Sequence, residues 1–118
     1  MRYSVDSGSA TPPFEQLRAQ VVAAVAVGQL GAGAKLPTVR ALAAELGLAV
    51  NTVARTYREL EADGVIETRG RAGSFVAPQG DAGQQQAQVA AREFVERARR
   101  LGLDDSAALD LVRAAQRG

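Results

Sequence analysis

The stretch that decides the fold is residues 35–76, KLPTVRALAAELGLAVNTVARTYRELEADGVIETRGRAGSFV. It contains a short helical pattern, a tight turn, a longer helical pattern and two β-strand patterns with basic residues between them. That order is typical of a winged helix-turn-helix, which lays its second helix in the major groove of DNA. The sequence therefore predicts a mainly α fold with a small β-wing.

The shorter helical pattern has a clear start and end. The Thr38 hydroxyl can cap free backbone N–H groups, so we expect the helix to begin there. Gly47 ends the pattern, because glycine readily adopts the left-handed conformation that closes a helix. Between them, an apolar face recurs at helical spacing: Val39, Leu42, Ala43 and Leu46.

The longer helical pattern opens at Asn51-Thr52 and has two different faces. The face expected to be buried, with Tyr57 as a core residue, consists of Val53, Tyr57 and Leu60. The opposite stripe consists of the hydrogen-bond donors Asn51, Arg55 and Arg58. Acidic residues come only at the far end, within 59–63, although the helix dipole favours acids near the N-terminus. This polarity suits a helix whose N-terminal half meets phosphate.

The two strand patterns, 65–68 and 74–77, flank the turn Arg69-Gly70-Arg71-Ala72-Gly73. A glycine-rich tip with two arginines can approach a sugar-phosphate backbone closely.

Simpler interpretations remain open for several of the residues described above. Asn51 and Thr52 can cap the second helix, Arg55 and Arg58 can pair with Glu59 or Glu61, and the wing arginines can act as solubilising charges.

Residues 13–76 resemble the DNA-binding domain of the GntR family of bacterial transcription regulators. The matching pieces include Phe14-Glu15-Gln16-Leu17, Leu36-Pro37-Thr38-Val39-Arg40, Asn51-Thr52-Val53, Tyr57-Arg58-Glu59-Leu60-Glu61 and Gly73-Ser74-Phe75-Val76. With the short segment after the wing, the chain is most similar to the YtrA-like branch. The sequence departs from the family pattern at Ala49, Val50 and Ala54, where relatives often have polar or basic residues.

The resemblance implies a repressor that binds double-stranded DNA, with contacts from Arg40, Asn51, Thr52 and the wing tip. Together with the donors found above, the candidate DNA-binding residues are Lys35, Thr38, Arg40, Asn51, Thr52, Arg55, Arg58, Arg69, Gly70 and Arg71. A symmetric dimer places two such helices about one turn of DNA apart, so we expect an inverted-repeat operator.

Outside this stretch, Pro13 opens an earlier helix whose apolar stripe is Phe14, Leu17, Val21, Ala24 and Val25. We expect a short strand at 3–6, a flexible connector at 28–34 and a linker at 78–83.

After the linker, the sequence predicts two short amphipathic helices, which cannot enclose a core alone. We expect them to form a homodimer interface through Ala87, Ala91, Phe94, Val95, Ala98, Leu101, Leu109 and Val112. The alternative is that they fold back on their own N-terminal domain.

Composition and charge limit the classes of function that we expect for this chain. The chain of 118 residues has a net charge of only +1, so the basic residues must be segregated on one surface for DNA binding. It contains no His and no Cys, and we find no metal-ligand cluster or phosphate-binding loop, so we expect no enzyme, cofactor or metal. There is no membrane-length apolar run and no signal-peptide pattern at the N-terminus, which favours a cytoplasmic protein.

These observations predict a winged helix-turn-helix domain at 1–78, with the helix-turn-helix at about 38–62 and the wing at about 65–77. A C-terminal helical dimerisation segment follows at 79–118. The favoured function is a sequence-specific transcription regulator that binds DNA as a homodimer, with an effector unknown. The alternative is a winged-helix protein-interaction module that binds no DNA.

Overall fold

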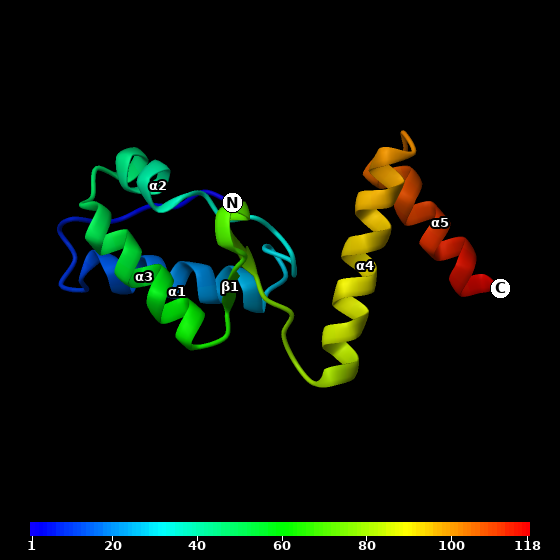
Figure 1. Ribbon diagram of the computed structural model, residues 1–118, viewed down its shortest axis with the longest axis horizontal. Coiled ribbons are helices and arrows are strands. Elements are labelled where there is room, and N and C mark those ends of the chain that lie inside the picture. Colours follow the sequence, from blue (N-terminus) through cyan, green and yellow to red (C-terminus); the bar gives the residue numbers. More distant parts are fainter. The chain divides into compact units, whose positions relative to one another are not determined.

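The computed structural model describes residues 1–118, which divide into two compact units, Met1–Gln79 and Gly80–Gly118. The first unit contains three helices and a two-stranded wing, and the second is a pair of helices (Figure 1). The expectation of a mainly α fold with a small β-wing is confirmed.

Helix α1, Pro13–Ala26, begins with proline in its first turn and buries Leu17, Val21 and Ala24. It packs mainly against α3.

The prediction of a short strand at 3–6 is wrong, because the backbone of this segment forms hydrogen bonds with side chains of α1 and not with another strand. The Gln16 side chain forms two hydrogen bonds with the Asp6 backbone, at 2.8 and 3.0 Å. The Gln20 side chain likewise accepts from the Ser4 N–H and donates to the Ser4 carbonyl oxygen.

The spacing of these two glutamines explains the arrangement. Residues four apart on a helix are separated by about 6 Å along its axis. Residues two apart in an extended chain are separated by about 6.6 Å. Gln16 and Gln20 therefore match Asp6 and Ser4, and their amide groups take the place of a neighbouring strand's backbone.

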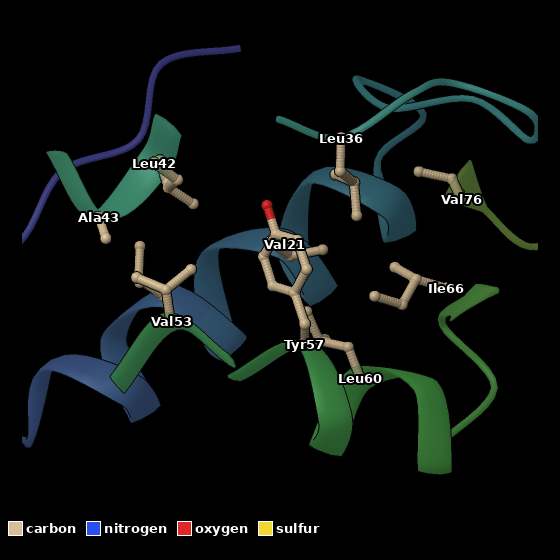
Figure 2. Close-up of a cluster of buried hydrophobic side chains, with 10 residues drawn as sticks. Val21, Leu36, Leu42, Ala43, Val53, Tyr57, Leu60, Ile66 and Val76 are labelled. Atoms are coloured by element: carbon tan, nitrogen blue, oxygen red, sulfur yellow. The ribbon is translucent and has the colours of Figure 1, made fainter. Parts of the chain in front are cut away.

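Helices α2, Val39–Leu46, and α3, Val50–Ala62, form the helix-turn-helix. Thr38 caps α2 by accepting the Ala41 N–H at 3.1 Å, and Gly47 ends it in the left-handed conformation with φ +68°, both as expected. Figure 2 shows the core that these helices share with α1 and the wing. The expected buried face of α3 is confirmed, and Thr56 is also fully buried on it.

The wing consists of β1, Ile66–Thr68, and β2, Ser74–Val76, paired antiparallel with Ile66 opposite Val76. A short 3-10 turn, η1, Gly70–Ala72, joins them. The far edge of β2 is also paired, because the Gly33 N–H donates to the Val76 carbonyl at 2.8 Å and the Leu36 N–H to the Ser74 carbonyl at 2.9 Å. The end of the expected flexible connector is thus held as a third strand-like segment beside the wing.

The second unit consists of α4, Ala82–Arg100, and α5, Asp105–Arg117. Asp81 and Gln84 form a reciprocal capping box, so α4 begins inside the segment expected to be a linker. Gly102, with φ +86°, follows the end of α4, and the Asp104 side chain caps α5 by accepting the Ala107 N–H at 2.8 Å. No helix combines the length and the hydropathy that a membrane span requires.

Candidate nucleic-acid interface

The start of α2 presents two of the candidate residues. The Thr38 hydroxyl oxygen accepts the Ala41 N–H, which leaves the hydroxyl hydrogen available to an acceptor outside the protein. Arg40 lies in the first turn of α2, where it is exposed and forms no ion pair. An unpaired arginine at this position has all five N–H donors available.

The start of α3 corrects one of the simpler interpretations. The N-cap of α3 is Ala49, which has no capping side chain, and Asn51 and Thr52 lie inside the first turn. The interpretation of these two residues as helix caps is therefore wrong. The Asn51 side chain is exposed and is not used by the helix, so its amide can bond to an outside partner.

Arg55 and Arg58 lie farther along the exposed side of α3 and differ in their contacts. The Arg55 guanidinium carbon lies 3.6 Å from the centroid of the Phe14 ring, and Arg55 Nε lies 3.5 Å from Glu59 Oε1. The ion pair considered from the sequence therefore forms for Arg55. Arg58 is exposed and forms no ion pair.

The two wing arginines also differ. Arg69 Nε donates to Glu67 Oε1 at 3.0 Å, and the Arg69 guanidinium lies over the Phe75 ring, 4.4 Å from its centroid. Arg71 is exposed, has no ion pair and lies in the η1 turn. Gly70, with φ +53°, allows the chain to make this turn. Of the two arginines at the tip, Arg71 is the one free to contact a new partner.

A hollow of about 270 Å³ lies between the wing and the segment that enters α2. It brings together four candidate residues, Lys35, Thr38, Gly70 and Arg71. The candidates on α3 and Arg40 do not line it. Two hydroxyl residues of the strands, Thr68 and Ser74, also line the hollow, although they were not among the candidates. Each lies two positions from the core residue of its strand, Ile66 or Val76, and so on the same face of the wing, which is the signal that could have found them.

The hollow depends on close contact between the wing and Lys35. Gly73 has φ +112°, and a Cβ atom added there would lie 3.2 Å from Lys35 Cε. At the inner end, the buried Tyr57 hydroxyl donates a 2.6 Å hydrogen bond to the Pro37 carbonyl oxygen. Burial raises the pKa of Tyr57, so this hydroxyl keeps its proton as the pH rises past the usual tyrosine range. The Tyr57 hydroxyl therefore adds no charge to the hollow that Lys35 and Arg71 line.

The acidic residues of α3 come late in the helix, as the sequence shows. Glu61, near the end of α3, accepts a hydrogen bond from the Thr68 hydroxyl of β1. Nowhere do three or more His, Cys, Asp or Glu side chains gather in a way that could hold a metal ion. The available chemistry at this surface is hydrogen-bond donation and positive charge, which suits phosphate and base edges.

The candidate interface residues of the second unit are mostly exposed. Ala98 is the buried exception, being only 3% exposed. Val95 is half-buried. The candidates that remain exposed are Ala87, Ala91, Phe94, Leu101, Leu109 and Val112.

A family model described as "Bacterial regulatory proteins, gntR family" matches residues 13–76, more than half of the chain. The chain belongs to the GntR family. This GntR-family chain is 50% identical over 105 residues to the HTH-type transcriptional regulator Rv1152 of Mycobacterium tuberculosis, covering 89% of the chain and 86% of that protein.

Two further relatives carry the name of the expected branch. The HTH-type transcriptional repressor YtrA of Bacillus subtilis is 42% identical over 74 residues, which are 62% of the GntR-family chain and 56% of YtrA. The structure of YtrA from Sulfolobus acidocaldarius, described as a GntR-family transcription factor, is 25% identical with a TM-score of 0.61. The match covers 96% of this chain and 95% of that one. The resemblance to the YtrA-like branch is confirmed.

Family membership decides between the two functions that the sequence leaves open. The chain is a DNA-binding transcription regulator of the GntR family and not a protein-interaction module that binds no DNA. Its relatives are transcription regulators, so the expectation that it is not an enzyme is confirmed. The donor-rich surface of α2, α3 and the wing is the part of this GntR-family domain that suits DNA.

Proposed function

We propose that this protein represses transcription by binding, as a homodimer, to an inverted-repeat operator in the bacterial cytoplasm. The main support for the proposal is a set of exposed hydrogen-bond donors on three elements. None of these donors forms an ion pair within the protein. They are Arg40 of α2, Asn51 and Arg58 of α3, and Arg71 of the wing. Because the net charge is only +1, the proposal requires these donors to lie together on the surface that meets DNA.

The donors divide into two roles. Helix α3 enters the major groove, where Asn51 suits a bidentate contact with adenine and an arginine suits guanine. Lys35, Thr38 and Arg71 line the hollow beside the wing and contact backbone phosphates. Phosphate contacts set the register of the protein on DNA, and base contacts select the sequence.

The second unit supports the homodimer. Its two helices leave large apolar side chains exposed, including Leu101 at 67%, Leu109 at 48%, Val112 at 38% and Phe94 at 38%. Two helices that bury so little apolar surface cannot form a sufficient core alone, and a second copy of the same pair covers these side chains most economically. A symmetric pair of domains then requires a symmetric operator.

The repressor role rests on the similarity to YtrA of Bacillus subtilis, which is named a transcriptional repressor. A dimer bound across a promoter occupies the surface that RNA polymerase needs. Placing the operator upstream of a reporter gene tests this role, because expression of the protein then lowers reporter output. An increase in output would identify an activator instead.

The operator itself is found by selecting bound duplexes from random DNA with the purified full chain. We expect an inverted repeat whose half-site centres lie about 10 base pairs, one helical turn, apart. Sedimentation of the complex should give two chains per duplex. Enrichment of single, unrepeated half-sites with one chain bound would overturn the dimer proposal. Failure to enrich any sequence would overturn specific DNA recognition by this surface.

A further inference from the structure

The ring of Phe14 supports the guanidinium group of Arg55. Phe14 is the second residue of α1, and Arg55 lies on the exposed side of α3. The guanidinium carbon is 3.6 Å from the ring centroid, which is close stacking for a cation on an aromatic face. The contact therefore joins a helix outside the helix-turn-helix to the exposed donor stripe of α3, which consists of Asn51, Arg55 and Arg58.

The position of Phe14 is set by its own backbone. The buried Thr56 hydroxyl, next to Arg55 in the chain, donates a 3.0 Å hydrogen bond to the Phe14 carbonyl oxygen. The Phe14 side chain is half-buried, and Leu17 one turn later is fully buried against the core. The start of α1 is thus held against the middle of α3, and the ring has a defined place under the guanidinium.

Stacking leaves the hydrogen-bonding edge of Arg55 available. A guanidinium group uses its flat face to stack on an aromatic ring, and its five N–H donors point outward in the plane. Arg55 Nε lies 3.5 Å from Glu59 Oε1, and exposed pairs of this kind are weak. Glu15 also attracts Arg55, but its carboxylate is hydrogen-bonded to Arg18. The remaining donors can bond to a phosphate or a base without breaking the stack.

We propose that Phe14 is a positioning residue, which holds Arg55 in the orientation in which it contacts DNA. The inference rests on the proposed function, because it assigns Arg55 a DNA contact. An arginine that is already ordered loses less side-chain freedom when DNA binds. By this reasoning Phe14 contributes to affinity although its ring makes no hydrogen bond to DNA.

The test is a double-mutant cycle that measures affinity for the duplex selected by the wild-type protein. Phe14→Leu keeps an apolar side chain but removes the aromatic face, and we expect it to weaken binding about 2- to 13-fold. Phe14→Tyr keeps the ring and should bind like wild type. In an Arg55→Ala background, Phe14→Leu should weaken binding no further, because the residue that it positions is absent.

Two further readouts separate positioning from a general loss of structure. Phe14→Leu removes no charge, so the dependence of affinity on salt should keep its wild-type slope. Thermal unfolding of each variant identifies any unfolded fraction at the assay temperature. An equal weakening by Phe14→Leu with and without Arg55, an Arg55→Ala variant that binds like wild type, or a Phe14→Tyr variant as weak as Phe14→Leu would overturn the inference. A wild-type protein that selects no duplex would overturn the proposed function instead.

Discussion

The hydroxyl of Tyr57 donates a 2.6 Å hydrogen bond to the carbonyl oxygen of Pro37. This bond joins the middle of α3 to the residue that precedes the α2 cap, Thr38. It therefore fixes the segment that contributes Lys35 and Thr38 to the hollow relative to α3. Tyr57 thus belongs to the core and also sets the geometry of the candidate interface.

Tyr57→Phe should lower the free energy of unfolding by about 1–2 kcal/mol, because it leaves the Pro37 carbonyl without this partner. It should also reduce the loss of stability at alkaline pH. Burial raises the pKa of Tyr57, so above about pH 10 the unfolded chain releases this proton while the folded chain retains it. Stability therefore falls as the pH rises through that range. Urea unfolding between pH 8 and 11 measures the effect.

Tyr3 also has a raised pKa, chiefly from burial and secondarily from Glu45, so some alkaline dependence should remain in Tyr57→Phe. Tyr3→Phe is the comparison variant: it should keep the larger part of the Tyr57 contribution, which comes from burial, and remove only the smaller part that comes from Tyr3. An alkaline slope that is identical in wild type and Tyr57→Phe would show that Tyr57 does not cause it.

Arg40→Ala should weaken specific operator binding about 5- to 160-fold for each lost contact while the protein remains folded. Arg40 is exposed in the first turn of α2, and removal of a good bidentate contact costs about 1–3 kcal/mol. Fluorescence anisotropy with the selected duplex measures affinity, and circular dichroism checks the fold. Arg117→Ala, which removes an exposed arginine at the end of α5, serves as the control. Wild-type affinity in Arg40→Ala would refute the contact.

Mutations in the wing and mutations in α3 should change different properties of DNA binding. Replacing Arg69 and Arg71 by alanine should weaken binding to all sequences. It should also flatten the salt dependence by about 0.9 in log–log slope for each phosphate that the protein no longer neutralises. Because Arg69 is held by Glu67 and Phe75, Arg71→Ala alone should account for most of the change. Asn51→Ala should instead alter which bases are preferred. An altered base preference with an unchanged salt slope in the wing variant would reverse the two assignments.

Gly73→Ala should destabilise the wing and weaken DNA binding. The backbone has φ +112° at this glycine, and the added Cβ would lie 3.2 Å from Lys35 Cε. Strain of this kind costs about 1–3 kcal/mol. Thermal unfolding and duplex affinity measure the two effects. Gly31→Ala is the matched control, because a Cβ there meets nothing within 4 Å, and an equal effect of the two substitutions would contradict the explanation.

Phe94→Asp should give a monomer that binds a half-site weakly and does not form the tight complex with the full operator. Phe94 is 38% exposed on α4, so covering that remaining area stabilises by about 0.6–1.1 kcal/mol in each subunit, and an unpaired carboxylate buried there adds a larger penalty. Sedimentation gives the mass in solution. Gln86→Asp introduces the same charge at an exposed position of α4 outside the proposed interface and should remain dimeric. A dimeric Phe94→Asp would move the subunit contact elsewhere.

The sequence alone predicted those features that depend on neighbours within a few positions. The cap at Thr38, the left-handed Gly47 and the buried face of Val53, Tyr57 and Leu60 all follow from local spacing. The motifs of 13–76 also sufficed to identify the family. These signals are reliable because helix caps, turns and amphipathic faces are properties of short segments.

The tertiary structure decided which side chains are free. The sequence could not show that Arg55 stacks on Phe14 or that Thr56 bonds to the Phe14 carbonyl, 42 residues away. It also left open the pairing of the segment before Leu36 with β2. Such contacts join residues that are distant in the chain, and no local pattern specifies them. Pairing of β1 with β2 places Phe75 near Arg69, so Arg69 is engaged within the wing by Glu67 and Phe75 while Arg71 remains available.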